Sequence, residues 1–417
     1  MSKFLLLFSV LLSISSFAQD IAHARKVVDT LTSPYFSGRG AANQGEKKAA
    51  DYIASVYQSI GLQRFNNSYF QTFTSPINTI IGALSVQLDK EPLIAGKDYL
   101  VDAASGKISG TFQLVWYTKE NVPSKKQLKK LIKKDFFHNK FIIVEEEGVE
   151  EGAEIFQILR QNAVEASGVI FLEKKLTQHL SKTNKEYGIL HILRDKISTN
   201  HTTITLTIPQ EFLPNYQSQN VIGSIKGTQH PDSFIMLSAH YDHLGRMGDA
   251  VYFPGANDNA SGVAMLLNMA SHYMENPPKK SVVFIAFGAE EIGLVGSKYF
   301  VEHPLVSLHQ INFVFNMDLM GTGIEGAMIV NGRVFETHFE KLKKINEKNG
   351  YLVQLKKRGK AANSDHYWFS EKGIPAFFIY LMGGITAYHD IYDLAETLPL
   401  TKFEDSFRLI TDFLNDL

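Results

Sequence analysis

The sequence contains no cysteine among its 417 residues. This absence excludes disulfide bonds and a thiolate nucleophile, and any metal site must therefore be built from histidine and carboxylate. An excess of charge of one sign is also lacking, because the formal net charge at pH 7 is only −1. A chain with so little net charge gives no general electrostatic reason to expect nucleic acid or an anionic membrane as a partner. Its substrate must be recognised locally.

Long apolar runs are scarce as well, and the most notable one lies at the N-terminus. Lys3 precedes the apolar stretch Phe4–Leu12, and Ser16 and Ala18 place small residues at positions −3 and −1 before Gln19. This pattern is typical of a secretory signal peptide and predicts removal of residues 1–18 by cleavage after Ala18. A membrane anchor is the alternative, but the run is too short to span a bilayer. We expect a secreted or periplasmic protein without stable membrane insertion after cleavage.

The composition is that of a globular protein, with 44% hydrophobic and 20% charged residues. From about Ser218 onward, apolar runs of strand length alternate with helical patterns. This alternation predicts an α/β fold of three layers, in which helices flank a twisted, mostly parallel sheet. Residues 81–208 instead show short β-like runs without a cluster of histidine and carboxylate at ligand spacing. We predict that they form a smaller, β-rich domain inserted into a main domain of residues 19–80 and 209–417.

The stretch Met236–Gly245 begins as a buried strand and ends in polar residues. His240 and Asp242 form an H-x-D pair at the point where the apolar run stops. At this spacing an imidazole can bind a metal while a nearby carboxylate fixes its orientation. A solvated ion pair between the two side chains is the alternative, so the pair needs support from elsewhere in the chain.

Further acidic and histidine residues follow the later predicted strands or lie in loops beside them. They are Asp258, Glu290, Glu291, Asp318 and His389. The carboxyl ends of parallel strands meet at one edge of a sheet, so such residues can form one site. Each also has a structural explanation: Asp258 can be a helix N-cap, and the two glutamates can form a solvated turn.

Taken together, two histidines and several carboxylates without a thiolate favour a catalytic rather than a structural zinc site. The carboxylates outnumber what one ion needs, which favours two metals that share a bridging carboxylate and activate a water molecule between them. One carboxylate that is left uncoordinated can then act as a general base.

Five ordered motifs, and two further stretches, resemble the zinc-dependent exopeptidases of the M28 family, which are co-catalytic dizinc aminopeptidases and their relatives. The motifs are SAHYDHLG, GANDNASG, FGAEEIGLVGS, NMDLMG and YHDIYDLAETL, and the further stretches are LTSPYFSGRG and NSDHYWF. The resemblance covers the chain outside the insert, and the insert itself resembles the protease-associated (PA) domain. There are departures: Asn257 stands where many relatives carry Asp, and Asp390-Ile391-Tyr392 stands where Thr-Pro is common.

The resemblance implies a role for each site residue. His240 and Asp318 would hold one Zn²⁺, Glu291 and His389 the other, and Asp258 would bridge the two ions. Glu290 would be the general acid/base, Asp242 would orient His240, and Tyr388 would stabilise the oxyanion. His243 is expected outside the set of ligands. Asp365 and His366 are candidates for the wall of the substrate pocket. The alternative is that both residues have only a structural role.

The resemblance thus implies an exported dizinc metallo-aminopeptidase that hydrolyses the N-terminal peptide bond of peptides, with a metal-activated water as nucleophile. A glutamate carboxypeptidase-like enzyme, a glutaminyl cyclase-like enzyme and a catalytically silent binding protein on the same scaffold are the alternatives. The cyclase needs only one zinc, and the silent proteins typically lose ligands, whereas every implied ligand is present here.

Overall fold

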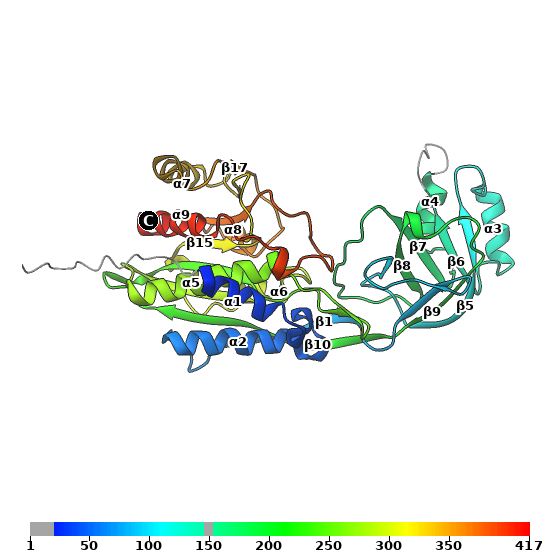
Figure 1. The fold of residues 1–417 in the computed structure, drawn as a ribbon, viewed down its shortest axis with the longest axis horizontal. Coiled ribbons are helices and arrows are strands. Elements are labelled where there is room, and N and C mark those ends of the chain that lie inside the picture. Colours follow the sequence, from blue (N-terminus) through cyan, green and yellow to red (C-terminus); the bar gives the residue numbers. More distant parts are fainter. Residues whose placement is uncertain (1–20, 146–152) are drawn as a thin grey trace, which may run out of the picture.

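The computed structural model describes residues 21–145 and 153–417, so the predicted signal peptide lies outside the described residues. The protein has two lobes, which lie side by side along its long axis and are connected through the strands β1 and β10 (Figure 1). Within the described ranges, every helix is too short or too polar to cross a bilayer.

The larger lobe is built on a ten-stranded mixed sheet in the order β13-β12-β1-β10-β14-β11-β15-β18-β16-β17. Its central strands β14, β11, β15 and β18 are parallel to one another. The strands are β1 (Phe70–Ile80), β10 (Gln210–Ile225), β11 (His230–His240), β12 (Arg246–Met247), β13 (Val251–Tyr252), β14 (Lys280–Phe287), β15 (Ile311–Met317), β16 (Ala327–Val330), β17 (Leu355–Lys357) and β18 (Ala376–Leu381).

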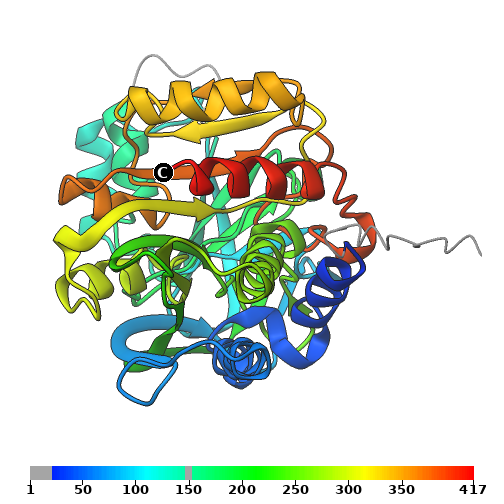
Figure 2. The same ribbon diagram turned by 90° about the vertical axis from the view of Figure 1, so that its left-hand side faces the viewer.

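Helices cover both faces of this sheet because its central strands are apolar on both sides. In β14, Val282, Phe284 and Ala286 pack into the core that includes residues of α1 (Ile21–Leu31), α2 (Gly45–Ile60), α5 (Gly262–Glu275), α7 (Glu336–Asn349) and α9 (Phe403–Asn415). The alternate residues Val283, Ile285 and Phe287 pack with α6 (Val295–Glu302) and α8 (His366–Glu371). Figure 2 looks onto this lobe, with α7 and α9 in orange and red. The predicted three-layer α/β fold is confirmed.

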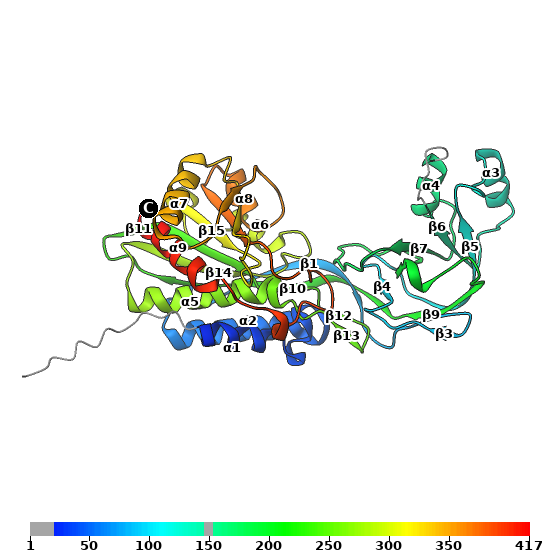
Figure 3. The same ribbon diagram turned by 45° about the horizontal axis from the view of Figure 1, so that its top comes forward.

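The smaller lobe contains a second sheet, with the order β3-β2-β9-β5-β6-β7-β8-β4 (Figure 3). Its strands are β2 (Ser85–Leu88), β3 (Glu91–Pro92), β4 (Tyr99–Val101), β5 (Ile108–Tyr117), β6 (Lys140–Val144), β7 (Gly168–Glu173), β8 (Gly188–Leu193) and β9 (Thr203–Ile208), accompanied by the helices α3 (Lys125–Lys133) and α4 (Ala153–Arg160). All eight strands fall within residues 81–208. The predicted boundaries and the likeness to a PA domain stay predictions.

β1 and the first half of β10 were not predicted from the sequence. These segments pair antiparallel from Phe70 to Ile80, with a register shift between Ser75 and Ile77 that places Pro76 in a bulge. A proline inside a strand pattern normally argues against a strand, and a bulge is one of the places that tolerate it. The inward-facing Gln71 and Asn78 also break the apolar pattern, and both donate hydrogen bonds to backbone carbonyls.

Candidate metal centre

The carboxyl ends of the central parallel strands bring the predicted metal residues to one edge of the larger sheet. His240 is the last residue of β11, and Asp318 follows directly after β15. Glu290 and Glu291 lie shortly after β14, which pairs with β11 on its other side. Neighbouring strands that run parallel present their ends at the same edge, so the side chains converge.

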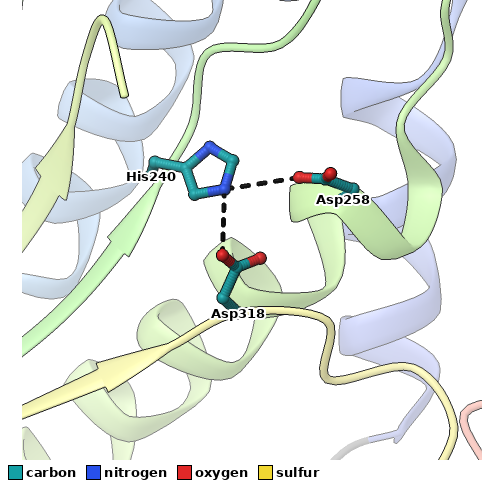
Figure 4. Close-up of side chains that lie close together, drawn as sticks. All are labelled: His240, Asp258 and Asp318. Atoms are coloured by element: carbon teal, nitrogen blue, oxygen red, sulfur yellow. Dashed lines mark ion pairs between the residues drawn. The ribbon is translucent and has the colours of Figure 1, made fainter. Parts of the chain in front are cut away.

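Asp258 lies at the centre of this arrangement. The Nε2 atom of His240 is 3.3 Å from Oδ1 of Asp258 and 3.4 Å from Oδ2 of Asp318 (Figure 4). The Nε2 atom of His389 is 3.1 Å from the other Asp258 oxygen, Oδ2, and 3.2 Å from Oε2 of Glu291. All five predicted metal residues therefore lie together, and the two carboxylate oxygens of Asp258 face different histidines.

The alternative role of Asp258 as a helix cap does not match its position. The turn η4 (Ala256–Ser261) contains Asp258, and α5 begins only at Gly262, whose N–H donates to Asn259 Oδ1. The backbone N–H of Asp258 instead donates to Oδ2 of Asp393 at 2.9 Å. Asp393 also accepts from the N–H of Asn257, so its carboxylate holds the loop that carries Asp258.

Arg39 also supports the loop that carries Asp258. Its side chain is completely buried. Among the described residues, the guanidinium donates to five backbone carbonyls, those of Leu31, Tyr241, Pro254, Gly255 and Asp258. Arg39 thus ties the loop that carries Asp258 to the backbone of Leu31 and Tyr241.

Asp242 connects two of the strand ends. Its carboxylate accepts hydrogen bonds from the backbone N–H of Glu290 at 3.0 Å and of Glu291 at 3.2 Å. Its backbone carbonyl lies 3.2 Å from Nδ1 of His240, whereas its nearest carboxylate oxygen is 3.9 Å away. A hydrogen bond from Nδ1–H to this carbonyl leaves Nε2 of His240 free as a metal ligand. The contact with His240 is therefore made mainly by the Asp242 backbone.

His243 is fully buried beside Glu291. Its Nδ1 is 2.6 Å from Oε1 of Glu291 and 4.0 Å from Oδ1 of Asp258. The short contact suits a residue that orients Glu291, as expected for a position outside the ligand set. His243, Asp258 and Glu291 also form a group of ligand atoms within 4.8 Å of one another, as do His240, Asp258 and Asp318.

The electrostatics of the cluster favour a bound cation. Burial raises the pKa of Asp258, but hydrogen bonds with His240 and His389 outweigh this effect and hold it well below its usual value. Burial raises the pKa of Asp318, and its Oδ1 has no hydrogen-bond partner among the described residues. Buried carboxylates without enough donors are costly unless a positive charge compensates them. This set of carboxylate oxygens and imidazole nitrogens therefore fits zinc.

Glu290 differs from the carboxylates around it. Its side chain forms no ion pair or hydrogen bond with the described residues, and it lines a pocket of about 210 Å³ beside the metal residues. Burial raises the pKa of Glu290 well above its usual value, an effect that nearby His240 reduces and Asp365 increases. A carboxyl group with a raised pKa is suited to accept and return a proton near neutral pH.

Tyr388 also lines this pocket and is 44% exposed. Its ring stacks on that of His389, with the ring centres 4.0 Å apart. Asp365 and His366 do not line the pocket but are fully buried, and burial raises the pKa of Asp365 to about 7. The pocket residue from this stretch is Asn363. The roles predicted for Asp365 and His366 in substrate binding stay predictions, which their burial does not favour.

The smaller lobe reaches the same site through a loop that the sequence analysis did not single out. His389 Nδ1 lies 2.9 Å from the backbone carbonyl of Gln178, and the N–H of Gln178 donates to the His389 carbonyl at 2.8 Å. Lys175 forms an ion pair with Asp390 at 3.3 Å. Gln178 acts through its backbone, so no sequence signal could have identified it. Asp393 did have a signal, as a carboxylate four residues after His389 in a recognised motif.

Comparison with known proteins identifies relatives of this arrangement. The sequence model of Peptidase family M28 matches residues 220–414. Aminopeptidase YwaD of Bacillus subtilis is 29% identical over 374 residues, which cover 84% of this chain and 74% of that protein. A glutamate carboxypeptidase 2 homolog of Caenorhabditis elegans is 30% identical over 226 residues, which cover 47% of this chain and 28% of that protein.

Solved structures share the fold over nearly the full length. BSAP, a zinc aminopeptidase from Bacillus subtilis, superposes with a TM-score of 0.71 and 24% identity, covering 95% of this chain and 94% of that chain. A Peptidase M28 precursor from Shewanella amazonensis gives a TM-score of 0.68 with 17% identity, covering 95% of this chain and 96% of that chain.

Proposed function

We propose that this chain, whose residues 220–414 match peptidase family M28, is a zinc-dependent exopeptidase that acts as an exported dizinc aminopeptidase on peptide substrates. The observation that carries the dizinc proposal is the position of Asp258, whose two carboxylate oxygens face His240 and His389 separately. A carboxylate with this arrangement can serve as a bridge between two ions.

In this proposal, His240 and Asp318 would hold one zinc ion, Glu291 and His389 would hold the other, and Asp258 would be shared. The fit rests on the absence of thiolate, on the convergence of buried carboxylates and on the unpartnered Oδ1 of Asp318. When bound, zinc acts as a Lewis acid that polarises the scissile carbonyl and lowers the pKa of water.

Glu290 is the proposed general base. It takes a proton from the attacking water and then returns it to the departing amine, which its pocket position and raised pKa support. The hydroxyl of Tyr388 is a candidate donor to the oxyanion because its side chain lines the same pocket. Asp242 keeps Glu290 and Glu291 in place through their backbone N–H groups.

Aminopeptidase activity is favoured over carboxypeptidase activity by the longer match to Aminopeptidase YwaD, which spans most of both chains. The match to the glutamate carboxypeptidase 2 homolog covers only 28% of that protein. Export is proposed from the N-terminal pattern alone, and a mature N-terminus at Gln19 is its expected signature.

A substrate panel tests the proposal. Peptides with a free N-terminus, with an acetylated N-terminus and with an amidated C-terminus are compared with the same purified protein. We expect cleavage of the first and third and no cleavage of the acetylated peptide. Cleavage that requires a free C-terminus and tolerates acetylation would instead indicate a carboxypeptidase.

A further inference from the structure

The pocket beside the metal residues contains one side chain with a permanent positive charge. Among its described lining residues, Arg358 is the only arginine or lysine. The other lining residues near the metal centre are carboxylates and histidines, which the proposed function assigns to zinc binding and proton transfer. Arg358 has no role in that chemistry.

Arg358 also lacks a carboxylate partner among the described residues. Within the described part of the chain, its side chain forms one hydrogen bond, from Nη1 to the hydroxyl of Tyr380 at 3.4 Å. Two of the nearby lysines are paired: Lys357 contacts Glu336 and Glu340, and Lys360 contacts Glu371. The chain thus supplies carboxylates to cations on both sides of Arg358 but none to Arg358 itself.

The backbone of Arg358 is held in place at the end of β17. Its N–H donates to the carbonyl of Ile329 at 2.9 Å, and its carbonyl accepts from the N–H of Arg333 at 3.0 Å. The anchored backbone limits where the guanidinium can reach, although the side chain itself remains exposed.

The neighbours of Arg358 in the pocket add both apolar and polar groups to the subsite. Leu319 and Phe378 supply apolar surface, and Asn363 and Tyr380 supply polar groups. The ring of Phe378 contacts that of Tyr380, with the centres 5.4 Å apart, so the apolar and polar parts adjoin. Such a wall suits a short methylene chain that ends in an acceptor of hydrogen bonds.

We propose that Arg358 binds a carboxylate of the peptide substrate and so gives the enzyme a preference for acidic substrates. Guanidinium groups bind carboxylates through charge-assisted and often bidentate hydrogen bonds. The carboxylate has two possible sources: the side chain of an N-terminal glutamate or aspartate, or the C-terminus of a dipeptide. The inference rests on the proposed function because it takes the pocket as the place where substrate binds.

The first arm of the test compares anilides of glutamate, glutamine and leucine with wild-type enzyme, Arg358→Gln and Arg358→Glu. The glutamine side chain has nearly the same size as that of glutamate but carries no charge. If the side chain is the source, kcat/KM of wild type is about 10-fold or more higher for glutamate than for glutamine, as expected for a charge-assisted hydrogen bond. Arg358→Gln brings this ratio close to one, while cleavage of the leucine substrate is retained.

The second arm compares a dialanine peptide with its C-terminal amide. If the substrate C-terminus is the source, wild type prefers the free acid by about 10-fold or more and Arg358→Gln removes this preference. The control variant is Lys356→Gln, which removes a neighbouring exposed cation that does not line the pocket. It is expected to leave both ratios unchanged.

Binding of free glutamate and free glutamine, measured by calorimetry with the zinc-loaded protein, separates this inference from the proposed function. Cleavage of the leucine substrate with no charge preference in either arm would overturn the carboxylate subsite and leave the aminopeptidase intact. An inactive protein that binds glutamate in preference to glutamine, and loses this preference in Arg358→Gln, would support the subsite and overturn the activity. Equal binding of the two amino acids by an inactive protein, unchanged in Arg358→Gln, would overturn both.

Discussion

Each lobe contains histidine set among carboxylates, and the two clusters are built differently. In the smaller lobe, His191 lies between Asp102 and Glu173, each 2.9 Å from a different ring nitrogen. In the larger lobe, the Nε2 atoms of His240 and His389 each face two carboxylates, and both face Asp258.

The difference concerns which carboxylate oxygens have a hydrogen-bond donor. A protonated His191 can donate to both carboxylates around it. The larger cluster has three carboxylates, of which Asp258 lies beside both histidines, and Asp318 Oδ1 is left without a partner among the described residues. A histidine with one carboxylate at each ring nitrogen therefore indicates a structural ion pair. Several carboxylates that converge on the Nε2 atoms of two histidines indicate a metal site.

The largest expected effect comes from Glu290→Gln. The amide cannot take a proton from water, so we expect kcat to fall by ~10³-fold or more. Zinc content remains that of wild type, because Glu290 is not among the proposed ligands. Steady-state kinetics and elemental analysis test this, with Glu173→Gln in the smaller lobe as a matched control that keeps wild-type kcat. An active Glu290→Gln would remove Glu290 from the mechanism.

His389→Ala is expected to release one of two zinc equivalents and to lower kcat/KM by ~10²-fold or more, since it removes a proposed ligand together with the ring that Tyr388 stacks on. His191→Ala is its counterpart in the smaller lobe and should leave zinc content unchanged. Elemental analysis after gel filtration measures both. Loss of zinc from His191→Ala would contradict the assignment of the His191 cluster as a structural ion pair.

Lys175→Ala is expected to have a smaller effect. It removes the ion pair with Asp390, which helps to hold the loop from the smaller lobe against His389. Because Lys175 is half-exposed, the loss corresponds to at most ~1 kcal/mol, or about fivefold weaker retention of the second zinc in a chelator titration. The adjacent exposed Lys174, changed to Ala, serves as control. Identical titrations for both variants would argue against a role of this ion pair.

The smallest effect concerns the pH dependence of stability in the smaller lobe. Burial lowers the pKa of His191, but Asp102 and Glu173 outweigh it and raise the pKa above its usual value. A raised folded-state pKa stabilises the fold fully below the unfolded value of about 6.5, and this contribution is lost as pH rises through the folded-state pKa.

His191→Gln should therefore lower the free energy of unfolding by about 1 kcal/mol at pH 6 and by less at pH 9. Thermal unfolding of the full chain at both pH values measures this difference. A larger destabilisation at pH 9 than at pH 6 would contradict the paired, protonated state of His191.

Much of the larger lobe could be predicted because its signals are local. The alternation of strands and helices predicted after about Ser218 is observed, and residues at the ends of apolar runs proved to lie together. The sequence did not predict a role for Asp393, Gln178 or Arg358, and the physical reason differs between them. Asp393 and Gln178 act on or through the backbone, and the role proposed for Arg358 rests on its lack of a carboxylate partner in the part of the chain that the structure describes. Such relations depend on contacts between distant segments, which neither periodicity nor motif spacing encodes.

The His191 cluster shows the same limit. Asp102, Glu173 and His191 come from three separate segments, so no ligand-like spacing marks them in the sequence. The loop that begins after Glu173 also delivers Gln178 to His389. The contribution of the smaller lobe to the metal centre became visible only from the fold.

The zinc content of the purified, metal-loaded wild-type protein tests the central claim most directly. The shared position of Asp258 between His240 and His389 predicts two zinc equivalents per chain, measured by elemental analysis after removal of free metal. A reproducible value near one would contradict the dizinc centre and would favour a mononuclear enzyme of the cyclase type.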